Sequence, residues 1–384
     1  MSFYLALKEI WRLRGRYLLF SLVIALITIL VLFIAALAGG LANANKQLIE
    51  KLDAEMLIYQ DNVDLQPTSS RLGQSKLSDM RRIEGVEDVG PLGLATATFV
   101  FSDGRSAIDI SLVGVEPGKP GDPPLLAGPG LRSKRHNDVV IDQDLASRAS
   151  LSLGDRFIIK SIQGTEEEFY ELSVVGITDS RQYFFLPSVF IPLRTWSEVR
   201  PQGESESAKA EIVFNIAAVK LQDPQLFDLV AQRMDHFVDG IEVADKQTAI
   251  LALPGYTAQQ STLNTQQIFT VLIGVLVVGG FFQIQTLQKV AQIGVLKAIG
   301  SSSSMVALAI LLQIILVTVI GVGIGSLGTM LLVLGMPSQI PILFTGSTVI
   351  SAFFLLLFIG PIGGLVSIRL ALKIDPLTAI GLSS

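Results

Sequence analysis

The sequence predicts an α-helical membrane protein with four transmembrane helices and an inserted α+β domain outside the cytoplasm. Residues 298–368 contain no Asp, Glu, Lys or Arg, and residues 247–288 form a second uncharged run. Residues 17–38 form a third, which as a helix spans about 33 Å at ~1.5 Å per residue. Roughly 20 apolar residues suffice for one crossing, so the C-terminal third must cross the bilayer repeatedly. The polar segment 46–246, which holds nearly all the charge, must lie outside the membrane.

The first hydrophobic segment is expected to stay attached to the chain. Its basic start and the Ala36-Leu37-Ala38 triplet resemble a signal peptide. A secretory h-region is only about 7 to 15 residues long, however, and this run has 22. We therefore predict a membrane helix rather than a cleaved leader.

The charge pattern predicts the orientation. The chain has 29 Lys and Arg and 34 Asp and Glu, of which 21 and 32 fall in the central segment. The two acids and eight bases outside it are Glu9, Asp375, Lys8, Arg12, Arg14, Arg16, Lys289, Lys297, Arg369 and Lys373. Because positive charge beside membrane helices stays in the cytoplasm, we expect both termini and the 289–297 loop inside and Asp103 outside. The lack of cysteine, and hence of disulfides, is compatible with a bacterial plasma (inner) membrane.

These patterns divide the chain into consecutive segments. In chain order we predict a cytoplasmic amphipathic helix (1–16), a first membrane helix (17–38), a stalk (39–56), the α+β domain (57–246), a return stalk (247–266), a second membrane helix (267–286), a cytoplasmic loop (287–304), a third membrane helix (305–332), an external loop (333–346), a fourth membrane helix (347–367) and a cytoplasmic tail (368–384).

The central segment is typical of short strands with a few helices. Residues 95–100 and 108–113 flank Asp103-Gly104, a hairpin signal because glycine accepts positive φ. Ser78 is expected to cap a short helix that ends near Gly85. Further strands are predicted at 157–159, 172–177 and 189–191, and a helix at 223–237.

Residues 39–56 are predicted to continue the first membrane helix as an amphipathic stalk, because Leu41, Leu48 and Leu52 recur among Asn, Lys, Gln and Glu. Such a helix would couple motion in the membrane to the domain, with residues 250–264 as its partner on the return side. The alternative is a solvated juxtamembrane helix that transmits nothing.

The sequence lacks the motifs of an enzyme. No G-x-x-x-x-G-K-[ST] phosphate loop occurs, since Gly118-Lys119 is followed by Pro120, so the chain is not expected to hydrolyse ATP by itself. The two histidines, His136 and His236, lack the spacing of a zinc site. We expect no catalytic residue, no metal, no directly bound cofactor and no nucleic-acid partner.

One apparent motif is expected to serve helix packing. Gly323, Gly325 and Gly328 match the dinucleotide fingerprint G-x-G-x-x-G, but they lie inside a predicted membrane helix, and that fingerprint needs a preceding strand. Small residues let membrane helices approach closely. The predicted crossings contain no charged residue, which argues against ion-coupled transport and favours an apolar or membrane-derived substrate.

A docking element is predicted in the cytoplasmic loop. Residues 289–300 form a short helical pattern with Val290, Ile293 and Leu296 on one side, both lysines free and Gly300 as its stop. Residues 293–300 resemble the E-I-G-x-L-[RK]-A-[LI]-G stretch of FtsX/MacB-type ABC transporter permeases, whose cytoplasmic helix is seated on the ATPase; the preceding residue is Gln where that family usually has Glu. By this resemblance the ATPase-coupling residues are Lys289, Val290, Gln292, Ile293, Gly294, Leu296, Lys297 and Gly300.

The resemblance to this family covers the whole chain. Residues 373–380 are similar to its closing D-P-x-x-A-[LI] stretch, though Gly381 stands where arginine is common. Residues 151–155, 174–177 and 190–193 look like strands of its extracytoplasmic domain. The resemblance implies a MacB-like periplasmic core for the α+β domain. It also implies the partners, which are a separate MacB/LolD-like ABC ATPase that binds the ATP, a second copy of this chain, membrane lipid and a periplasmic adaptor.

A narrower likeness lies in the stalk, where residues 41–45 and 51–55 resemble the HrtB group of heme-export permeases and DevC-like exporters. We therefore expect the permease subunit of a MacB-type ABC exporter, which uses ATP-driven motion to expel an amphiphilic or lipid-like substrate, with heme as one candidate. The alternative is an FtsX-like regulator that activates a cell-wall hydrolase without transport and exposes an apolar patch on its outer domain. The geometry of the predicted helices places a substrate groove at Phe33, Leu37, Leu41, Ile268, Phe269 and Leu272.

Overall fold

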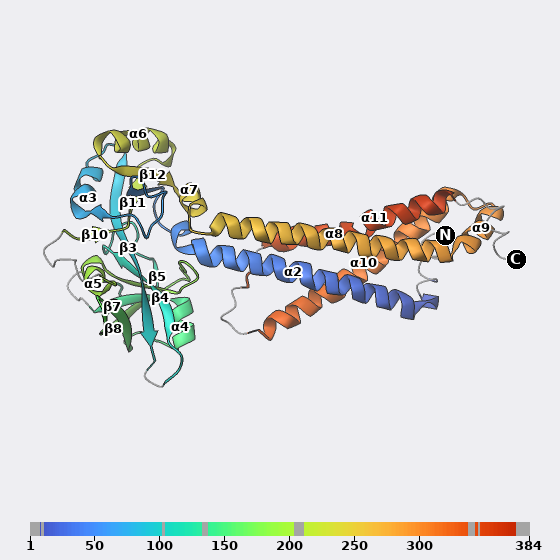
Figure 1. The fold of residues 1–384 in the computed structure, drawn as a ribbon, viewed down its shortest axis with the longest axis horizontal. Helices are drawn as coiled ribbons and strands as arrows, with labels where there is room; N and C mark the ends of the chain where they lie inside the picture. Colours follow the sequence, from blue (N-terminus) through green and yellow to red (C-terminus); the bar gives the residue numbers. More distant parts are fainter. Residues whose placement is uncertain are drawn as a thin grey trace. The chain divides into compact units, whose positions relative to one another are not determined.

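The computed structural model describes residues 8, 11–101, 104–132, 137–202, 211–336, 342–344 and 346–373 (Figure 1). The chain forms two compact units. The membrane unit comprises Met1–Leu41 and Gln260–Ser384, and the inserted domain comprises Ala42–Gln259. Asp103, His136 and the tail after residue 373 lie outside the described residues, as does most of the predicted 1–16 helix.

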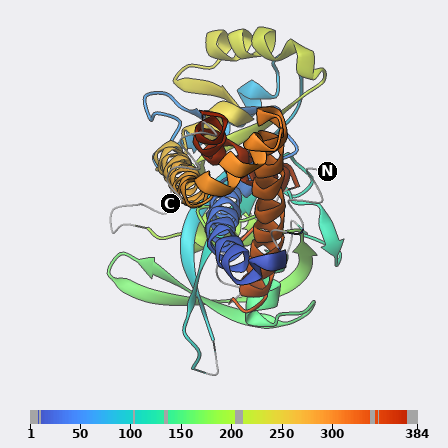
Figure 2. The same cartoon turned by 90° about the vertical axis from the view of Figure 1, so that its right-hand side faces the viewer.

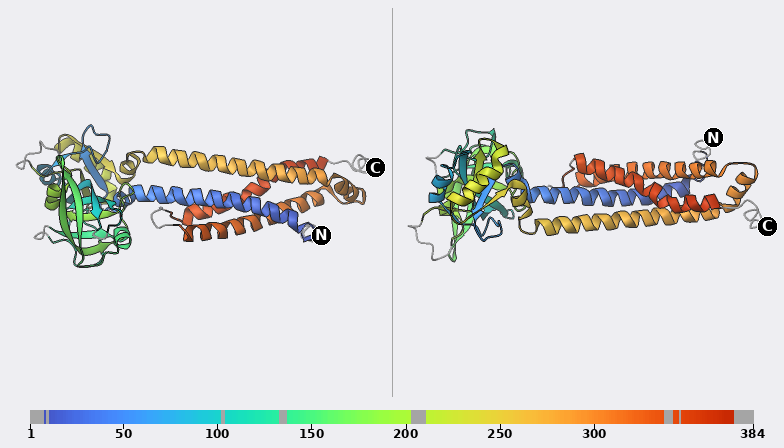
Figure 3. Two further views of the ribbon diagram at one scale, coloured as in Figure 1. Left: turned by 60° about the horizontal axis from the view of Figure 1, so that its bottom comes forward. Right: turned by 90° about the horizontal axis from the view of Figure 1, so that it is seen from above.

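Four long helices run through the membrane unit (Figure 3). Each contains a stretch long and apolar enough to cross a membrane, which confirms the four predicted hydrophobic helices. In lipid a helix is the form that satisfies every backbone polar group of such a segment internally. The long helices and the short helix that joins the second to the third are α2 (Arg14–Glu50), α8 (Tyr256–Gln288), α9 (Val290–Ala298), α10 (Ser303–Leu334) and α11 (Gly346–Lys373).

Glycines let these helices approach one another. A Cβ placed on Gly325 of α10 would lie 2.7 Å from the carbonyl oxygen of Ala25 in α2, whereas one on Gly323 would meet nothing within 4 Å. A Cβ on Gly363 of α11 would lie 2.7 Å from the carbonyl oxygen of Val275 in α8. The G-x-G-x-x-G motif therefore lies in the interior of a helix, where two of its glycines, including Gly328, face α2.

The described strands of the inserted domain form a large mixed sheet and a separate small pair. The pair consists of β2 (Leu72–Gly73) and β10 (Val213–Phe214). The strands of the large sheet are β1 (Met56–Gln60), β3 (Val86–Val100), β4 (Ile108–Val115), β5 (Leu125–Ala127), β6 (Asp138–Asp142), β7 (Arg156–Gln163), β8 (Glu166–Thr178), β9 (Ser188–Pro192), β11 (Ile216–Leu221) and β12 (Ile241–Asp245).

The large sheet closes partly on itself. β3 pairs with β4, β4 with β9, β9 with β6, β6 with β8, β8 with β7, and β7 with β3 again. Only β4–β9 and β6–β8 are parallel among these pairs. The long β3 also pairs with β11, which leads through β1 to the edge strand β12. The predicted hairpin is confirmed, since Phe99 of β3 pairs with Ile108 of β4.

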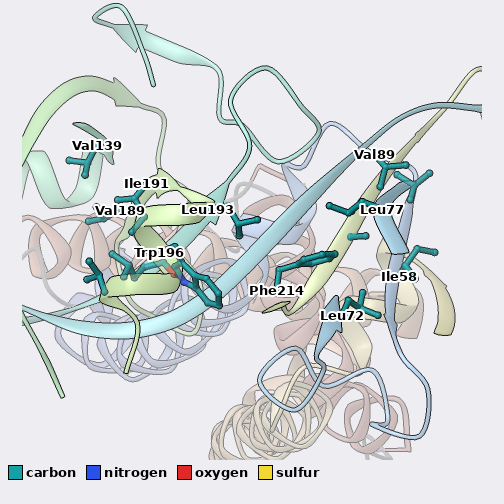
Figure 4. Close-up of a cluster of buried hydrophobic side chains, with 14 of the residues drawn as sticks. Ile58, Leu72, Leu77, Val89, Val139, Val189, Ile191, Leu193, Trp196 and Phe214 are labelled. Atoms are coloured by element: carbon teal, nitrogen blue, oxygen red, sulfur yellow. Dashed lines mark hydrogen bonds between the residues drawn. The ribbon is translucent and has the colours of Figure 1, made fainter. Parts of the chain in front are cut away.

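Short helices cover one face of this sheet over a shared hydrophobic core, part of which is drawn in Figure 4. They are α3 (Gln74–Met80), α4 (Gln143–Ala149), α5 (Leu193–Val199) and α6 (Phe227–Phe237), which follows a 3-10 turn at Pro224–Leu226. Trp196 of α5 lies over the paired Gly93 and Gly114, where a Cβ would approach its ring to 2.5 Å, and its indole nitrogen donates to the Leu112 carbonyl. Glycine at both positions is thus needed to make room for the indole.

A second hydrophobic cluster lies in the inserted domain and includes the C-terminal end of α2. Leu48, Ile49 and Leu52 are at most 4% exposed and pack with residues of the sheet such as Leu57 and Val113. Burial of each such side chain contributes about 1.5–3 kcal/mol. The stalk is therefore not a solvated helix on this face.

Two predicted elements of the domain need correction. The helix expected to begin at Ser78 instead spans Gln74–Met80, with Ser78 in its last turn, because the helix starts directly where β2 ends and buries Leu77 and Met80. The return side is not one helix over 250–264. It is divided between α7 (Lys246–Leu251) and α8, because the chain turns at Gly255, which has φ +73°.

Candidate functional site

The predicted docking loop forms α9, between α8 and α10 (Figure 2 views the chain from the side on which α9 lies). The helix ends as predicted at Gly300, which has φ +98°. The amide of Ser301 donates to the Leu296 carbonyl and the amide of Gly300 to the Lys297 carbonyl. These two bonds form a Schellman motif, which glycine favours because it adopts positive φ without strain.

One face of α9 packs against α10 within this chain. Ile293 is 5% exposed and packs against Val306 and the partly buried Ile310 of α10. Ile293, to which the resemblance assigns a role in ATPase coupling, is therefore covered by α10 within this chain, and that role stays a prediction. Periodicity showed which residues share a face but did not show which face points inward.

A neighbouring face of α9 is exposed. Val295, Leu296 and Ile299 are 46%, 40% and 79% exposed, and Gln292 is exposed as well. Their i, i+3, i+4, i+7 spacing places them on one side of a helix. We call Gln292, Val295, Leu296 and Ile299 the exposed stripe. Val295 and Ile299 were missed from sequence, although this spacing could have identified them.

Both lysines of the loop are held by other helices rather than free. The ammonium of Lys289 donates to the Tyr17 hydroxyl of α2 at 3.1 Å, and that hydroxyl donates to Oε1 of Gln313 in α10 at 3.3 Å. Lys297 donates to the Leu372 carbonyl of α11 at 3.0 Å. The ends of α9 are therefore tied to α2, α10 and α11.

The C-terminal end of α2 is gripped by a loop of the inserted domain. The amide of Leu48 donates to the Gln182 carbonyl at 3.0 Å, and the amide of Phe185 donates to the Ala44 carbonyl at 3.2 Å. Phe184 and Phe185 adopt φ of 51° and 67°, an unusual conformation for aromatic residues. We call the contact between residues 44–51 and residues 179–185 the stalk clamp.

Side chains reinforce the stalk clamp. Oε1 of Gln47 accepts from the Ser180 hydroxyl and from the Gln182 amide, both at 3.1 Å. Asp179 accepts from Lys51 and from Arg181, each at 2.7 Å. Partial burial raises the pKa of Asp179, but the hydrogen bonds and charges of Lys51 and Arg181 outweigh this and hold that pKa below its ordinary value.

Two family models match the chain. The MacB-like periplasmic core domain matches residues 17–237, and the FtsX-like permease C-terminal region matches residues 267–376. The chain belongs to the FtsX/MacB family of ABC transporter permeases. This confirms the resemblance seen in the docking loop and in the closing stretch.

Individual relatives agree with the family. The permease is 28% identical over 377 residues to a protein that carries the name of a hemin transport system permease, HrtB, from Staphylococcus haemolyticus, with 98% of this chain and 99% of that one covered. It is 23% identical over 263 residues to the macrolide export ATP-binding/permease protein MacB of Psychrobacter cryohalolentis, with 64% and 38% covered.

Two of the solved structures similar to the permease are domains of transporters. The extracellular domain of the noncanonic ABC-type transporter YknZ from Gram-positive bacteria is 12% identical, with 50% of this chain and 100% of that one covered and a TM-score of 0.35. The periplasmic region of MacB from Actinobacillus actinomycetemcomitans is 14% identical, with 52% and 92% covered and a TM-score of 0.36.

The predicted substrate-groove residues of the permease lie on two helices. Phe33, Leu37 and Leu41 of α2 are partly buried, whereas the three residues on α8 are 53–68% exposed. α2 and α8 contact each other where Phe20 stacks on Phe281. Both aromatic residues are at least nine residues away in sequence from the predicted groove positions. Within the described residues, none of the six predicted positions belongs to a buried hydrophobic cluster, so the groove stays a prediction.

A buried acidic residue of the permease lies next to the stalk clamp. Asp142 caps α4 by accepting from the Leu145 amide at 2.8 Å, and it accepts from the Ser188 amide at 2.9 Å. Burial raises its pKa to about 7, the charge of Asp144 adds to this rise, and the two amide bonds oppose it. Asp144 in turn accepts from Nε2 of Gln182 at 2.8 Å and from the Ser180 hydroxyl.

Proposed function

We propose that this chain is the permease subunit of an ABC exporter that expels an amphiphilic or lipid-like substrate, with hemin as the first candidate. The stalk clamp is the observation that carries the proposal. The continuous helix Arg14–Glu50 is hydrogen-bonded at its C-terminal end to a loop of the inserted domain, so motion of the helix is passed to that loop. Hemin is chosen because the HrtB relative is similar over nearly the full length of both chains.

The proposed mechanism is mechanical transmission. A separate MacB/LolD-like ATPase binds ATP and docks on the exposed stripe of α9. ATP-driven movement of α9 passes to α2 through Lys289 and Tyr17, and to α11 through Lys297. α2 then moves the stalk clamp, and the substrate leaves past the predicted groove at the outer ends of α2 and α8.

A homodimer is part of the proposal. The most apolar stretch of α8 is 17% buried in one copy of the chain, against 39–44% for the other long helices. An apolar helix surface that a single copy leaves uncovered is expected to face lipid or a second copy. A second α8 would complete the groove around Ile268, Phe269 and Leu272.

The proposed orientation places both termini and α9 in the cytoplasm of a bacterial plasma membrane. The chain has no cysteine, so single cysteines can be introduced without background. Asp103→Cys is expected to react with an impermeant thiol reagent in intact cells, and Lys289→Cys is not. Labelling at position 289 would overturn this orientation.

The alternative, an FtsX-like regulator without transport, predicts an apolar patch on the outer domain. Ile158 and Ile162 of β7 and Phe169 of β8 are 43%, 55% and 58% exposed, and Phe169 pairs with Lys160 between the two isoleucines. A cell-wall hydrolase would bind such a patch in this alternative, and a periplasmic adaptor would bind it in the export proposal.

Export can be tested in cells that lack this chain. We expect the deletion strain to accumulate hemin or amphiphilic drugs and to tolerate them poorly. Ile299→Asp should reproduce this defect by blocking ATPase docking, and Leu41→Lys should reproduce it by placing charge in the groove. Normal tolerance in all three strains, combined with a cell-separation or wall defect, would overturn the export proposal in favour of the regulator.

A further inference from the structure

A cavity of about 100 Å³ lies between α9 and the first turns of α10, within the membrane unit. Its wall is mainly apolar and includes Ile293, Leu296, Met305 and Ile310. Lys289 and Gln313 also line it. A drug-sized ligand needs a pocket of roughly 300–1,000 Å³, so this cavity is too small for one and has the size of a single large side chain.

The cavity is continuous with the exposed stripe of α9. Gln292 and Leu296 belong to both the stripe and the cavity wall, so a protein that covers the stripe also covers this wall. Interfaces between proteins concentrate their binding energy in a few side chains that enter such pockets near the centre of the contact. The occupant is therefore expected to be a side chain of the docked protein.

The charge around the cavity indicates which kind of group the partner places beside it. Within the described residues of the membrane unit there is no Asp or Glu, whereas Lys289 lines the cavity and Arg16 bonds to Gln288 beside it. The Tyr17 hydroxyl accepts a hydrogen bond from the ammonium of Lys289 and so positions it. Tyr17 itself is only 2% exposed. A positively charged rim favours an acidic group on the partner.

We infer that this cavity receives one large apolar side chain of the ABC ATPase, flanked by an acidic residue that pairs with Lys289. This inference rests on the proposed docking of the ATPase on α9 and adds a second contact to it. In this arrangement the permease contacts the ATPase in two places. The exposed stripe of α9 binds the surface of the ATPase, and the cavity between α9 and α10, which we call the socket, receives one of its side chains.

Filling the socket tests the inference without changing the exposed stripe. Ala309 lines the cavity, and Ala307 on the same helix does not. We expect Ala309→Leu to weaken binding of the ATPase at least about tenfold, while Ala307→Leu binds as the wild type does. The probe is the ABC ATPase that co-purifies with the wild-type chain, purified and titrated onto each variant in detergent. Thermal unfolding of Ala309→Leu should be unchanged or higher, because the substitution fills a void.

The charge can be tested by neutralising one cation at the cavity and one away from it. Lys289→Gln should weaken ATPase binding about fivefold at low salt and less at high salt, while Arg369→Gln, at an exposed position of α11 outside the cavity, should have no such effect. Wild-type affinity in Ala309→Leu, with binding lost in Ile299→Asp, would overturn the socket and leave the docking site standing. Wild-type affinity in both would overturn the docking site as well.

Discussion

The amide of Leu48 in the last turns of α2 is hydrogen-bonded to the carbonyl oxygen of Gln182, 3.0 Å away in the inserted domain. In a regular α-helix this amide pairs with the carbonyl of Ala44, and that carbonyl also accepts from the amide of Phe185 in the same loop, at 3.2 Å. The loop therefore bonds to the very groups that define a helical turn. An axial shift of α2 cannot occur at this point without moving the loop or breaking both bonds.

Gln47→Leu should uncouple the stalk from the inserted domain. The substitution removes the oxygen that accepts from Ser180 and Gln182, and it leaves the Gln182 amide without this acceptor. We expect a loss of about 1–3 kcal/mol in the free energy of unfolding. Export should fall while ATP hydrolysis by the complex continues. Gln143→Leu, at an exposed position, is the control, and equal export by both variants would contradict a role for the stalk clamp.

Ile293→Asp and Ile299→Asp should fail for different reasons. A charge at the buried Ile293 costs at least several kcal/mol, so thermal unfolding of the purified chain should shift sharply downward. Ile299 is 79% exposed, so its substitution should leave thermal unfolding unchanged and abolish co-purification of the ATPase. The reverse pattern would show that Ile293 and not the exposed stripe contacts the ATPase.

Gly325→Ala should destabilise the membrane unit while Gly323→Ala should not. A methyl group at position 325 meets the Ala25 carbonyl and the Thr28 side chain of α2, and overpacking of this kind costs about 1–3 kcal/mol. A methyl group at position 323 meets nothing within 4 Å. Thermal unfolding in detergent compares the two variants, which differ by two residues in one helix. Equal unfolding temperatures would argue against close α2–α10 packing.

Asp142 should make the stability of the inserted domain depend on pH. Its pKa is about 7 when folded, against about 3.9 for an unfolded Asp. Between these values the folded state holds a proton that the unfolded state has released, so stability falls as pH rises from about 4 to about 7 and is lowest above that range. Denaturant unfolding of the full chain at pH 5, 6, 7 and 8 measures this slope.

Asp142→Asn should flatten this dependence because the amide does not titrate. The control is Asp245→Asn, which changes another helix cap, where hydrogen bonds from Thr248 lower the pKa. Asp245→Asn should keep the decline between pH 5 and pH 7. A wild-type slope in Asp142→Asn would assign the pH dependence to another group.

Local patterns in the sequence predicted much of this molecule. Uncharged runs gave the membrane helices because lipid tolerates few alternatives to a helix. The turn residue Gly104 marked the β3–β4 hairpin. Ser78 misled, because the preceding strand and the buried Leu77 and Met80 set the start of α3, and tertiary packing outweighs a local cap.

The functional contacts were harder to predict than the fold. The stalk clamp depends on backbone amides and carbonyls, such as those of Leu48 and Gln182, which every residue carries. Such a contact between distant segments leaves no signature in residue type. The face of α9 that packs inward was equally hard to predict. The family stretch identifies the helix, but it does not indicate whether Ile293 or Ile299 points toward α10.

The first and last strands of the inserted domain are neighbours, since Met56 of β1 pairs directly with Asp245 of β12. Paired residues of antiparallel strands have Cα atoms only about 4.5–5.5 Å apart. The domain is therefore a cassette with adjacent ends, and a tight turn in its place could reconnect the flanking helices. Related permeases with the same membrane helices can therefore exchange the whole outer domain at this one place, where β1 and β12 lie side by side. Engineered chimeras are best joined at the same two strands.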